Sequence, residues 1–331
     1  MIRYRFGADD LLRTRFAVSP LFEVVWSTHV LRERPPRALH RPWVAAARAR
    51  LAGLDWALLD LVANGAGERR SFGFVPDFIT PPPVTPIADL EGELARVRAT
   101  PAEQVAREIG RRFEGYEIPA VVRPLIDDPA RGLVRLADTM RAYWERALEP
   151  WWPSIRALVE ADIVHRARRL AAGGTIDVFA GLHRRVRWRD GVLEVEHRVD
   201  HDVDLGGRGL LLVPAAFGWP EVFTMIDEPW QPSLVYTPRG VGALWAPPAE
   251  ADPGALDALL GRRRAAILRV LRAPATTHEV AERLSASPAG VSEHLGVLRA
   301  AGLVRGRRDG RRVVYTRTAA GEQLLRAPGG P

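Results

Sequence analysis

The hydrophobic period of the chain changes at Gly173-Gly174. In residues 101–172 apolar side chains recur at intervals of three and four positions, which predicts helices. In residues 182–205 apolar and polar side chains alternate around Asp190-Gly191, which predicts antiparallel strands joined by a two-residue turn. Three later segments are also expected to be strands: GRGLLLVPAAFG, EVFTMI and SLVYTPRGVGALW. Because the helices precede the strands, this part is expected to be an α+β domain, helices first and an antiparallel sheet second.

The stretch WAPPAEADPGALD, residues 245–257, interrupts any regular element with its prolines and glycine. It also separates two parts of different charge. Residues 255–331 contain 14 Arg against 6 Asp and Glu, a balance of +8, whereas residues 1–254 contain 33 Arg against 34, a balance of −1. We therefore expect two domains, residues 1–250 and residues 251–331. A basic domain attracts nucleic acid, acidic membranes and acidic proteins alike, so a motif must identify the partner.

The composition excludes several kinds of site. The chain has no Cys, which excludes disulfides, thiolate metal sites and cysteine nucleophiles. No run approaches the roughly 18 apolar residues of a membrane span, and residues 1–16 alternate charged with apolar side chains, unlike the apolar core of a signal peptide. We expect a cytoplasmic protein with no membrane partner and no cofactor.

The basic domain is expected to begin with three helices. Residues 253–272 place six apolar side chains on one stripe, which predicts a single amphipathic helix. Thr276 and Glu279 have the spacing of a capping box for the second helix, and Ser287 followed by Pro288 starts the third. The stripe of the first helix consists of Leu256, Leu259, Leu260, Ile267, Leu268 and Leu271.

The third helix has an unusually small outer face. At 100° per residue, Val291, Leu295 and Leu298 fall together on the inner face. The opposite face consists of Ala289, Ser292, Glu293, Gly296 and Ala300. A solvated helix normally carries long charged side chains there, whereas a helix that enters a DNA major groove, about 12 Å wide, needs small ones.

An arginine-rich hairpin follows this helix. With Asp309-Gly310 as a type I′ turn, Arg308 would oppose Arg311 and Arg307 would oppose Arg312. Like charges directly across two strands are destabilising, so the tip is expected to meet an anionic partner, and DNA phosphates supply that charge. Val304, Val313 and Tyr315 are expected to share one face of the hairpin.

The segment EVAERLSASPAGVSEHLGVLRAAGLVRGRRDGRRVVYTRT resembles the ArsR-type winged helix, with its V-S-x-x-L-x-x-L recognition helix and A-G-L-V entry into an arginine-rich wing. The resemblance covers residues 255–325 and implies a homodimeric transcriptional regulator, paired through residues 255–272 and 319–327. Residues 2–27 resemble the uncharacterised N-terminal domain that some of these regulators carry in GC-rich bacteria, which implies no known activity. The expected fold class is therefore α+β, with a large N-terminal helix-plus-antiparallel-sheet domain and a small C-terminal winged helix-turn-helix domain.

The chain departs from the metal-sensing members of this family. The helix THEVAERL lacks their paired cysteines, and AAGEQLL lacks the Asp and His of their second site, so we expect no metal. Glu293 stands where many members have His or another donor, and a carboxylate there is expected to accept a hydrogen bond from cytosine N4. The residues expected to contact DNA are Thr277, Ser287, Ala289, Gly290, Ser292, Glu293, His294, Arg299, Arg305, Arg307, Arg308, Arg311 and Arg312.

Residues 1–250 contain no recognisable catalytic set, because no Ser-His-Asp order, paired-carboxylate spacing or nucleotide fingerprint stands out. In the segment 197–204, His197 and His201 would lie roughly 13 Å apart on a strand, too far for one metal ion. The neighbouring tryptophans Trp144, Trp151 and Trp152 leave two alternatives open, a packed core or an aromatic ligand cavity.

We expect a transcriptional regulator that binds double-stranded DNA at an inverted repeat as a homodimer and represses by blocking a promoter. The N-terminal domain would sense an unknown small-molecule effector or support assembly. Two alternatives remain: an enzyme or ligand-binding N-terminal domain with an appended winged helix, and a pure protein-interaction module. A cleft with convergent titratable groups would favour the enzyme, and an exposed apolar patch would favour the interaction module.

Overall fold

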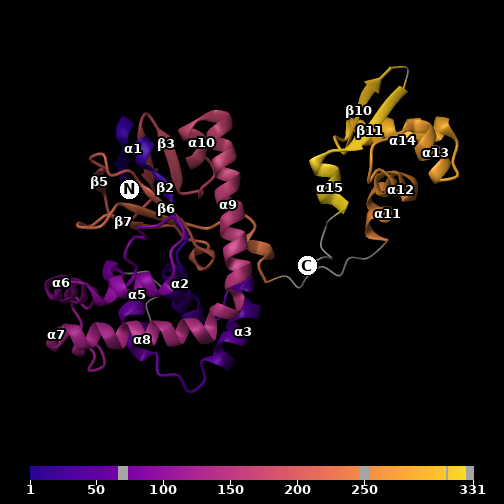
Figure 1. The fold of residues 1–331 in the computed structure, drawn as a ribbon. Coiled ribbons are helices and arrows are strands. Elements are labelled where there is room, and N and C mark those ends of the chain that lie inside the picture. Colours follow the sequence, from indigo (N-terminus) through magenta and orange to yellow (C-terminus); the bar gives the residue numbers. More distant parts are fainter. Residues whose placement is uncertain (66–73, 246–253, 311, 326–331) are drawn as a thin grey trace. The chain divides into compact units, whose positions relative to one another are not determined.

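The computed structural model describes residues 1–65, 74–245, 254–310 and 312–325 (Figure 1). The chain divides into two compact units, Met1–Trp245 and Ala246–Pro331. The fold class α+β is confirmed, with a large N-terminal unit and a small C-terminal unit. The boundary expected between residues 250 and 251 lies outside the described residues and stays a prediction. Within the described ranges, no helix is both long enough and apolar enough to cross a membrane.

The helical part of the N-terminal unit is built around α2 (Pro20–Arg32), which Ser19 caps by accepting a hydrogen bond from the Phe22 N–H. This helix is buried on nearly every side, as its apolar sequence requires. The helices around it are α3 (Arg41–Arg50), α4 (Ala57–Asn64), α5 (Leu90–Arg98), α6 (Ala102–Arg112), α7 (Pro124–Asp127), α8 (Pro129–Ala147) and α9 (Trp152–Gly173).

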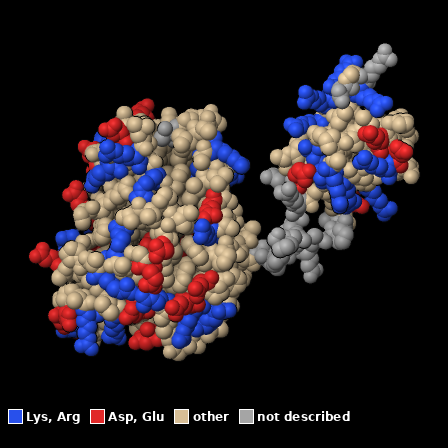
Figure 2. Space-filling view, in the orientation of Figure 1, with Lys and Arg blue, Asp and Glu red and all other residues tan. Residues whose placement is uncertain are grey.

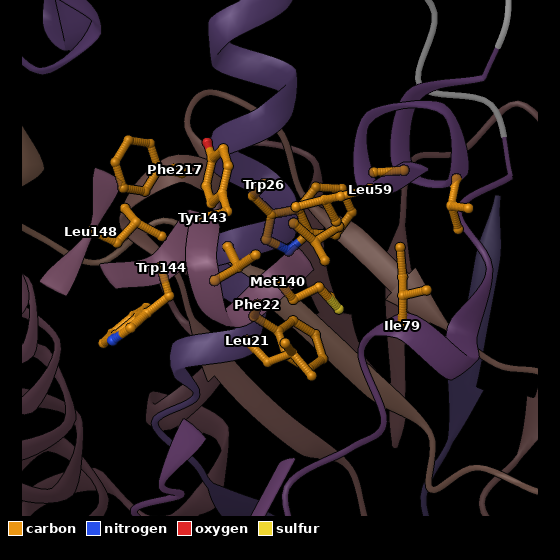
Figure 3. Packing of buried hydrophobic residues seen from close by; sticks show 14 of the residues in the cluster. Leu21, Phe22, Trp26, Leu59, Ile79, Met140, Tyr143, Trp144, Leu148 and Phe217 are labelled. Carbon is orange, nitrogen blue, oxygen red and sulfur yellow. The ribbon is translucent and has the colours of Figure 1, made fainter. Parts of the chain in front are cut away.

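The core of this helical part is packed with aromatic side chains (Figure 3). Trp26 from α2 stacks on Phe223, with ring centroids 3.7 Å apart. Trp144 from α8 is only 6% exposed and meets Trp152 edge to face. Of the two alternatives for the tryptophans, Trp144 therefore belongs to a packed core.

Two four-stranded sheets complete the N-terminal unit, in the orders β3-β4-β1-β5 and β2-β6-β8-β7. Both sheets are mixed, because β1 pairs with β5, β2 with β6, and β6 with β8 in parallel. The expectation of an antiparallel sheet is therefore wrong for these pairs. The strands are β1 (Ile2–Arg5), β2 (Arg15–Phe16), β3 (Val186–Arg189), β4 (Val192–Val195), β5 (His201–Asp204), β6 (Leu211–Pro214), β7 (Phe223–Met225) and β8 (Ser233–Tyr236).

The sheet with β6 and β8 lies between two hydrophobic cores. Leu211 and Val213 belong to the helical core, whereas Leu212 and Leu234 belong to the core shared with the other sheet and with α10 (Thr175–Phe179). Both faces of these strands are buried, which explains the continuous apolar run LLLVP in the sequence. The N-terminal unit is thus layered as helices, sheet and sheet.

The hairpin β3–β4 turns at Asp190 (φ 48°) and Gly191 (φ 80°), which confirms the two-residue turn. The alternation beyond β4 does not continue this strand, which ends at Val195. The next strand, β5, pairs instead with β1 from the other end of the sequence. The expectation that helices come first and strands second is wrong here, because β1 and β2 enter the sheets before any of the long helices.

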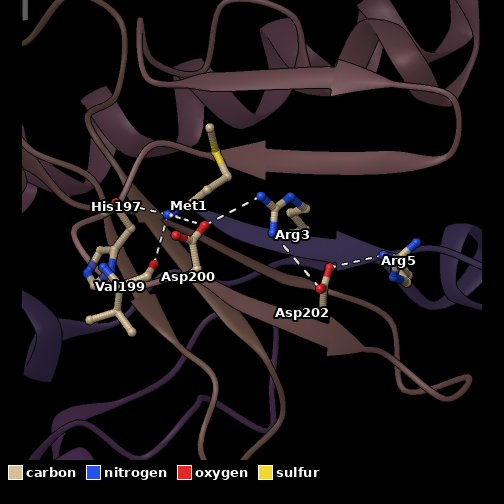
Figure 4. A network of polar contacts seen from close by, with 7 residues as sticks. All are labelled: Met1, Arg3, Arg5, His197, Val199, Asp200 and Asp202. Carbon is tan, nitrogen blue, oxygen red and sulfur yellow. Dashed lines mark hydrogen bonds and ion pairs between the residues drawn. The ribbon is translucent and has the colours of Figure 1, made fainter.

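A polar network joins β1 to β5 and to the segment before it (Figure 4). The Met1 amino group donates to the carbonyls of His197 and Val199 at 2.9 and 2.8 Å. Arg3 and Arg5 form ion pairs with Asp200 and Asp202. These pairs are exposed, so each contributes little to stability. Among the residues that the structure describes, no group of three or more His, Asp and Glu is placed to hold a metal ion.

The C-terminal unit consists of α11 (Ala255–Leu260), α12 (Arg262–Val270), β9 (Ala275–Thr276), α13 (Thr277–Arg283), α14 (Pro288–Ala300), β10 (Val304–Asp309), β11 (Arg312–Arg317) and α15 (Ala319–Leu325). Its three strands form one sheet in the order β10-β11-β9. The single helix expected over residues 253–272 is wrong: Gly261, with φ 81°, separates α11 from α12. Leu259 consequently leaves the apolar stripe and is 70% exposed.

Candidate nucleic-acid interface

The helix α13 begins with the expected capping box. Thr276 Oγ1 accepts a hydrogen bond from the Glu279 N–H, and Glu279 Oε2 accepts from the Thr276 N–H at 2.7 Å. The hydrogen bonds from Thr276 hold the pKa of the Glu279 carboxyl below its ordinary value. Thr277, a candidate DNA contact, is the first residue of α13 and is half-buried at this helix start.

The helix α14 also begins as expected. Ser287 Oγ accepts from the Gly290 N–H at 3.2 Å, and Pro288 is the first helical residue. Val291, Leu295 and Leu298 are at most 2% exposed and join the core of the unit. The expected inner face of this helix is confirmed.

The outer face of α14 consists mainly of small side chains, with Glu293 among them and Val297, 44% exposed, at its border. Ala289, Ser292, Gly296 and Ala300 are exposed. A Cβ added at Gly296 would meet no atom within 4 Å, so the helix surface is open at that point. A partner can therefore approach the α14 backbone closely along this face.

Glu293, a larger polar residue, lies on this face and is exposed. Arg299 and His294 flank the face; Arg299 is exposed and His294 is half-buried. Neither Glu293 nor Arg299 forms an ion pair with another side chain that the structure describes. Both remain available to an external partner.

The hairpin β10–β11 has a different register from the expected one. Arg307 lies opposite Val314, Arg308 opposite Val313, and Asp309 opposite Arg312. Asp309 is therefore a strand residue and not a turn residue, and the expected cross-strand arginine pairs are wrong. Arg311, the expected partner of Arg308, lies outside the described residues.

A glycine explains the register. Gly306 lies opposite Tyr315, and a Cβ at Gly306 would be 3.1 Å from both Tyr315 Cε1 and Val313 Cγ1. The Tyr315 ring thus occupies the space above the glycine, while Tyr315 and Val304 remain buried on the same face. The expected shared face of Val304, Val313 and Tyr315 is preserved, although Val313 is 38% exposed. We call the hairpin β10–β11, residues 304–317, the wing.

The wing presents arginines on both of its faces, since neighbouring strand residues point to opposite sides. Arg305 and Arg307 share one face with Arg312, and Arg308 lies on the other. All four are exposed, and none forms an ion pair with an acidic side chain among those described. Arg305 Nε donates to Thr316 Oγ1 at 3.1 Å. This hydrogen bond holds the Arg305 side chain against the neighbouring strand β11.

In the observed register the wing arginines do not repel one another across the strands, so repulsion gives no reason to expect an anionic partner. The reason is instead that several exposed arginines of the wing form no ion pair within the described residues. Figure 2 shows arginine side chains over much of the visible face of the C-terminal unit, with fewer acidic side chains among them. The described ion pairs of this unit are Arg269–Asp257 and Arg317–Glu322. They involve neither Arg299 nor the wing arginines 305, 307, 308 and 312. A small-faced helix beside a positively charged hairpin is the arrangement that a DNA groove and its flanking phosphates fit.

Residues 262–307 match the family model of a helix-turn-helix domain. The matched range contains α12, α13, α14 and the start of the wing. The C-terminal unit is therefore a helix-turn-helix domain of a DNA-binding regulator. Residues 106–241 match a family of unknown function (DUF5937), which supports a distinct N-terminal domain but assigns it no activity. Residues 2–27, on which the N-terminal resemblance rests, lie outside that matched range.

The chain has no significant match among the curated proteins or among the solved structures. The individual DNA contacts expected from the sequence therefore remain predictions. The structure places the described ones on three elements, the start of α13, the outer side of α14 and the wing. Sequence reasoning missed two features, the Gly306–Tyr315 contact and the exposure of Leu259. A glycine in a strand is the signal that would have pointed to the first.

Proposed function

We propose that the protein is an ArsR-type winged-helix transcriptional repressor that binds an inverted repeat in double-stranded DNA as a homodimer. The observation that carries this proposal is the largely small outer face of α14 beside a wing of which arginines 305, 307, 308 and 312 form no ion pair in the described part of the chain. In this arrangement α14 enters the major groove and the wing neutralises the adjacent phosphates.

The proposed roles of the residues differ. Ser292 and Glu293 lie on the exposed face of α14 and are positioned to read bases, whereas Ser287 is engaged in capping and would position the helix. The wing arginines would contact phosphates, which fix orientation without reading sequence. Specificity would therefore depend on α14, and most of the salt-dependent affinity on the wing.

The proposed dimer uses α11, α12 and α15. Leu259 is 70% exposed on α11, and its neighbours Leu256 and Leu260 are only partly buried. An exposed leucine on a short helix is readily covered by the same helix of a second chain, because a two-fold axis makes each surface meet its own copy. Promoter blocking and the repression that follows are inferred from this arrangement.

We further propose that residues 1–245 bind an effector and are not an enzyme. A hollow between α2, α3 and α4 contains one carboxylate, Asp60, and both of its oxygens are held by Arg32 at 2.8 and 2.7 Å. A carboxylate whose two oxygens both accept hydrogen bonds from one guanidinium is not free to accept a proton from a substrate. A ligand that prefers one dimer geometry would change operator affinity by its differential binding to the two states.

Selection of DNA fragments from a randomised pool by the full-length chain tests the DNA-binding proposal. We expect a consensus of two inverted half-sites with centres about 10 base pairs or a multiple of it apart, and two chains per duplex by analytical ultracentrifugation. A pool that shows no enrichment over its input would contradict sequence-specific binding, and one chain per duplex would contradict the dimer.

Leu259→Ser tests the dimer surface against a matched control. Leu12 is 84% exposed in the N-terminal unit, so Leu12→Ser makes the same chemical change elsewhere. We expect Leu259→Ser to shift the chain toward monomer and to weaken operator binding, and Leu12→Ser to change neither. Equal behaviour of the two variants would place the dimer contact elsewhere.

A further inference from the structure

A hollow of about 420 Å³ opens in the N-terminal unit where α2 and α3 end and α4 begins. Its volume is in the range of small-molecule sites, roughly 300–1,000 Å³. The lining residues are Leu31, Arg32, Arg34, Arg48, Leu51, Ala52, Trp56 and Asp60. The expectations from the sequence assigned none of them to a site.

One side of the hollow is apolar and fixed. Leu31 and Leu51 are 7% and 6% exposed and belong to the helical core. The Trp56 indole packs against that core, with its ring centroid 5.4 Å from that of Tyr143. A half-buried indole held in this way offers a flat apolar surface at little entropic cost to a ligand.

The other side carries an excess of positive charge. The guanidinium of Arg32 is engaged, because it donates to both Asp60 oxygens and to the Gly65 carbonyl at 2.9 Å. Asn64 Nδ2 also donates to Asp60 Oδ1 at 2.8 Å, so this wall of the hollow is held rigidly. The Arg32–Asp60 pair is electrically neutral as a unit.

Arg34 and Arg48 supply the excess charge. Arg48 Nη2 donates to the Leu31 carbonyl at 3.1 Å, which leaves its charge uncompensated, and neither arginine forms an ion pair with a described acidic side chain. Both residues are exposed, so their guanidinium groups remain hydrated until a ligand arrives. Two such groups at the edge of an apolar hollow are suited to a planar anion, because guanidinium donors match a carboxylate in pairs.

We propose that this hollow binds a small organic carboxylate with a flat apolar body, the body against Trp56 and Leu51 and the carboxylate between Arg34 and Arg48. This inference rests on the proposed effector-binding role of residues 1–245 and specifies its chemistry. A neutral ligand would gain no charge-assisted hydrogen bonds from the two guanidinium groups, and a simple inorganic anion would leave the apolar wall in contact with water.

The position of α3 gives the site a physical link to the end of the unit. Arg48 and the residues after it line the hollow, while Trp43 near the start of the same helix lies 6.5 Å, centroid to centroid, from the Trp245 ring. Trp245 Nε1 donates to Nδ1 of the buried His40 at 3.2 Å, just before α3. A ligand that moves α3 therefore acts on the last described residue of the N-terminal unit.

Isothermal titration calorimetry of the full-length chain without DNA tests the proposal. The probes are 2-naphthoate, its neutral analogue 2-naphthamide, and inorganic phosphate. We expect 2-naphthoate to bind once per chain and 2-naphthamide to bind at least about tenfold more weakly, since the amide lacks the negative charge that guanidinium groups recognise. Phosphate is expected not to bind at this site.

Matched arginine variants locate the binding. Arg34→Gln and Arg48→Gln should each weaken 2-naphthoate binding about tenfold. Arg41→Gln and Arg50→Gln make the same change at exposed positions of α3 outside the lining and should leave binding unchanged. Arg34 has no described hydrogen bond or ion pair, so Arg34→Gln tests the site even if Arg48→Gln disturbs the end of α2.

Three results would overturn the proposal: no heat from 2-naphthoate at millimolar concentration, equal binding of naphthamide or phosphate, or equal weakening by the control variants. Because the titration contains no DNA, its failure leaves the DNA-binding proposal untouched. Conversely, if the chain binds 2-naphthoate but enriches no DNA sequence, the carboxylate site would stand and the proposed role as a transcriptional regulator would be contradicted.

Discussion

Many arginines of the N-terminal unit are held by defined partners, whereas those of the wing face solvent. Arg166 on α9 is 1% exposed, and its Nε donates to Asp162 Oδ2 at 2.9 Å. Asp162 also accepts hydrogen bonds from the Tyr236 hydroxyl and the Arg239 N–H. Arg307 and Arg308, by contrast, are exposed and lack acidic partners in the described residues. The same side chain is part of a buried ion pair in one unit, and in the other it forms the surface that we propose binds a polyanion.

The difference shows why the number of arginines is a poor guide to function. Residues 1–254 contain 33 arginines and residues 255–331 only 14, yet the charge balance is −1 in the first part and +8 in the second. We expect charge without a partner to attract DNA, because the opposite charges of an ion pair largely cancel each other's field at a distance.

The largest expected effect concerns the buried pair of the N-terminal unit. Arg166→Met should lower the free energy of unfolding of this unit by about 3–5 kcal/mol, because the buried Asp162 loses its cation. Arg156 on the same helix forms an exposed pair with Glu160, so Arg156→Met should cost no more than about 0.5 kcal/mol. All ten tryptophans lie in residues 1–245, so denaturation followed by tryptophan fluorescence reports this unit alone. Equal stability of both variants would contradict the expected difference between a buried and an exposed ion pair.

The wing provides the converse experiment. Arg307→Glu with Arg308→Glu should weaken binding to every DNA sequence and reduce the salt dependence, by about 0.9 in log–log slope for each phosphate that the variant no longer neutralises. The paired control, Arg41→Glu with Arg50→Glu, makes the same charge change at exposed positions of the N-terminal unit and should have little effect. Fluorescence anisotropy at several salt concentrations measures both, and an unchanged slope for the wing variant would remove the wing from the interface.

A smaller effect is expected at Glu293, an acidic residue on the face that we propose enters the groove. Glu293→Ala should keep or raise affinity for random DNA, since a negative charge is removed. It should also lose preference at one position of each half-site, worth about 1–3 kcal/mol if the carboxylate accepts from a cytosine amine. Selection from randomised operators decides the matter: identical consensus sequences for wild type and variant would show that Glu293 reads no base.

The last comparison lies within the N-terminal unit, which also buries carboxylates that form no ion pair with a described arginine. Glu23 accepts hydrogen bonds from the Ala216 and Phe217 N–H groups, and burial raises its pKa to about 7. The folded state therefore retains a proton that the unfolded state, with a pKa near 4.5, loses, so stability should fall as pH rises from about 4.5 to 7. This group contributes at most about 1.4 kcal/mol per pH unit.

Glu23→Gln should flatten that dependence, because an amide does not ionise. Glu103→Gln, at an exposed position of α6, is the control and should leave the curve unchanged. Urea denaturation at pH 5, 6 and 7 measures the effect. An equal pH dependence of the wild type and of Glu23→Gln would contradict the raised pKa.

Local sequence is sufficient for the features that depend on a few neighbouring residues. The caps of α13 and α14 involve hydrogen bonds only three residues apart, at Thr276 and Ser287, and the sequence predicts both. The turn at Asp190-Gly191 is predictable for the same reason. The helix-turn-helix order and the inner face of α14 also follow from sequence, because helical periodicity shows which side chains share a face.

The register of the wing cannot be predicted from the pattern of apolar residues in its strands. Strand side chains alternate with a period of two, so sliding one strand by two residues keeps Val304 and Tyr315 on the core side in either register. The packing of the Tyr315 ring over Gly306 selects one of them, and that packing exists only in the folded sheet. The break at Gly261 escapes prediction because a glycine inside an apolar stripe is compatible with a continuous helix as well.

The sequence by itself therefore determined the two-part organisation, the basic character of the second part and the small outer face of α14, all of which depend on composition or on spacing within one element. Only the tertiary structure decided which arginines have partners, that β1 joins β5 from the far end of the N-terminal unit, and that Arg34, Arg48 and Trp56 line one hollow. These features depend on contacts between distant segments, whose pairing is set by the packing of the whole unit and not by any local pattern.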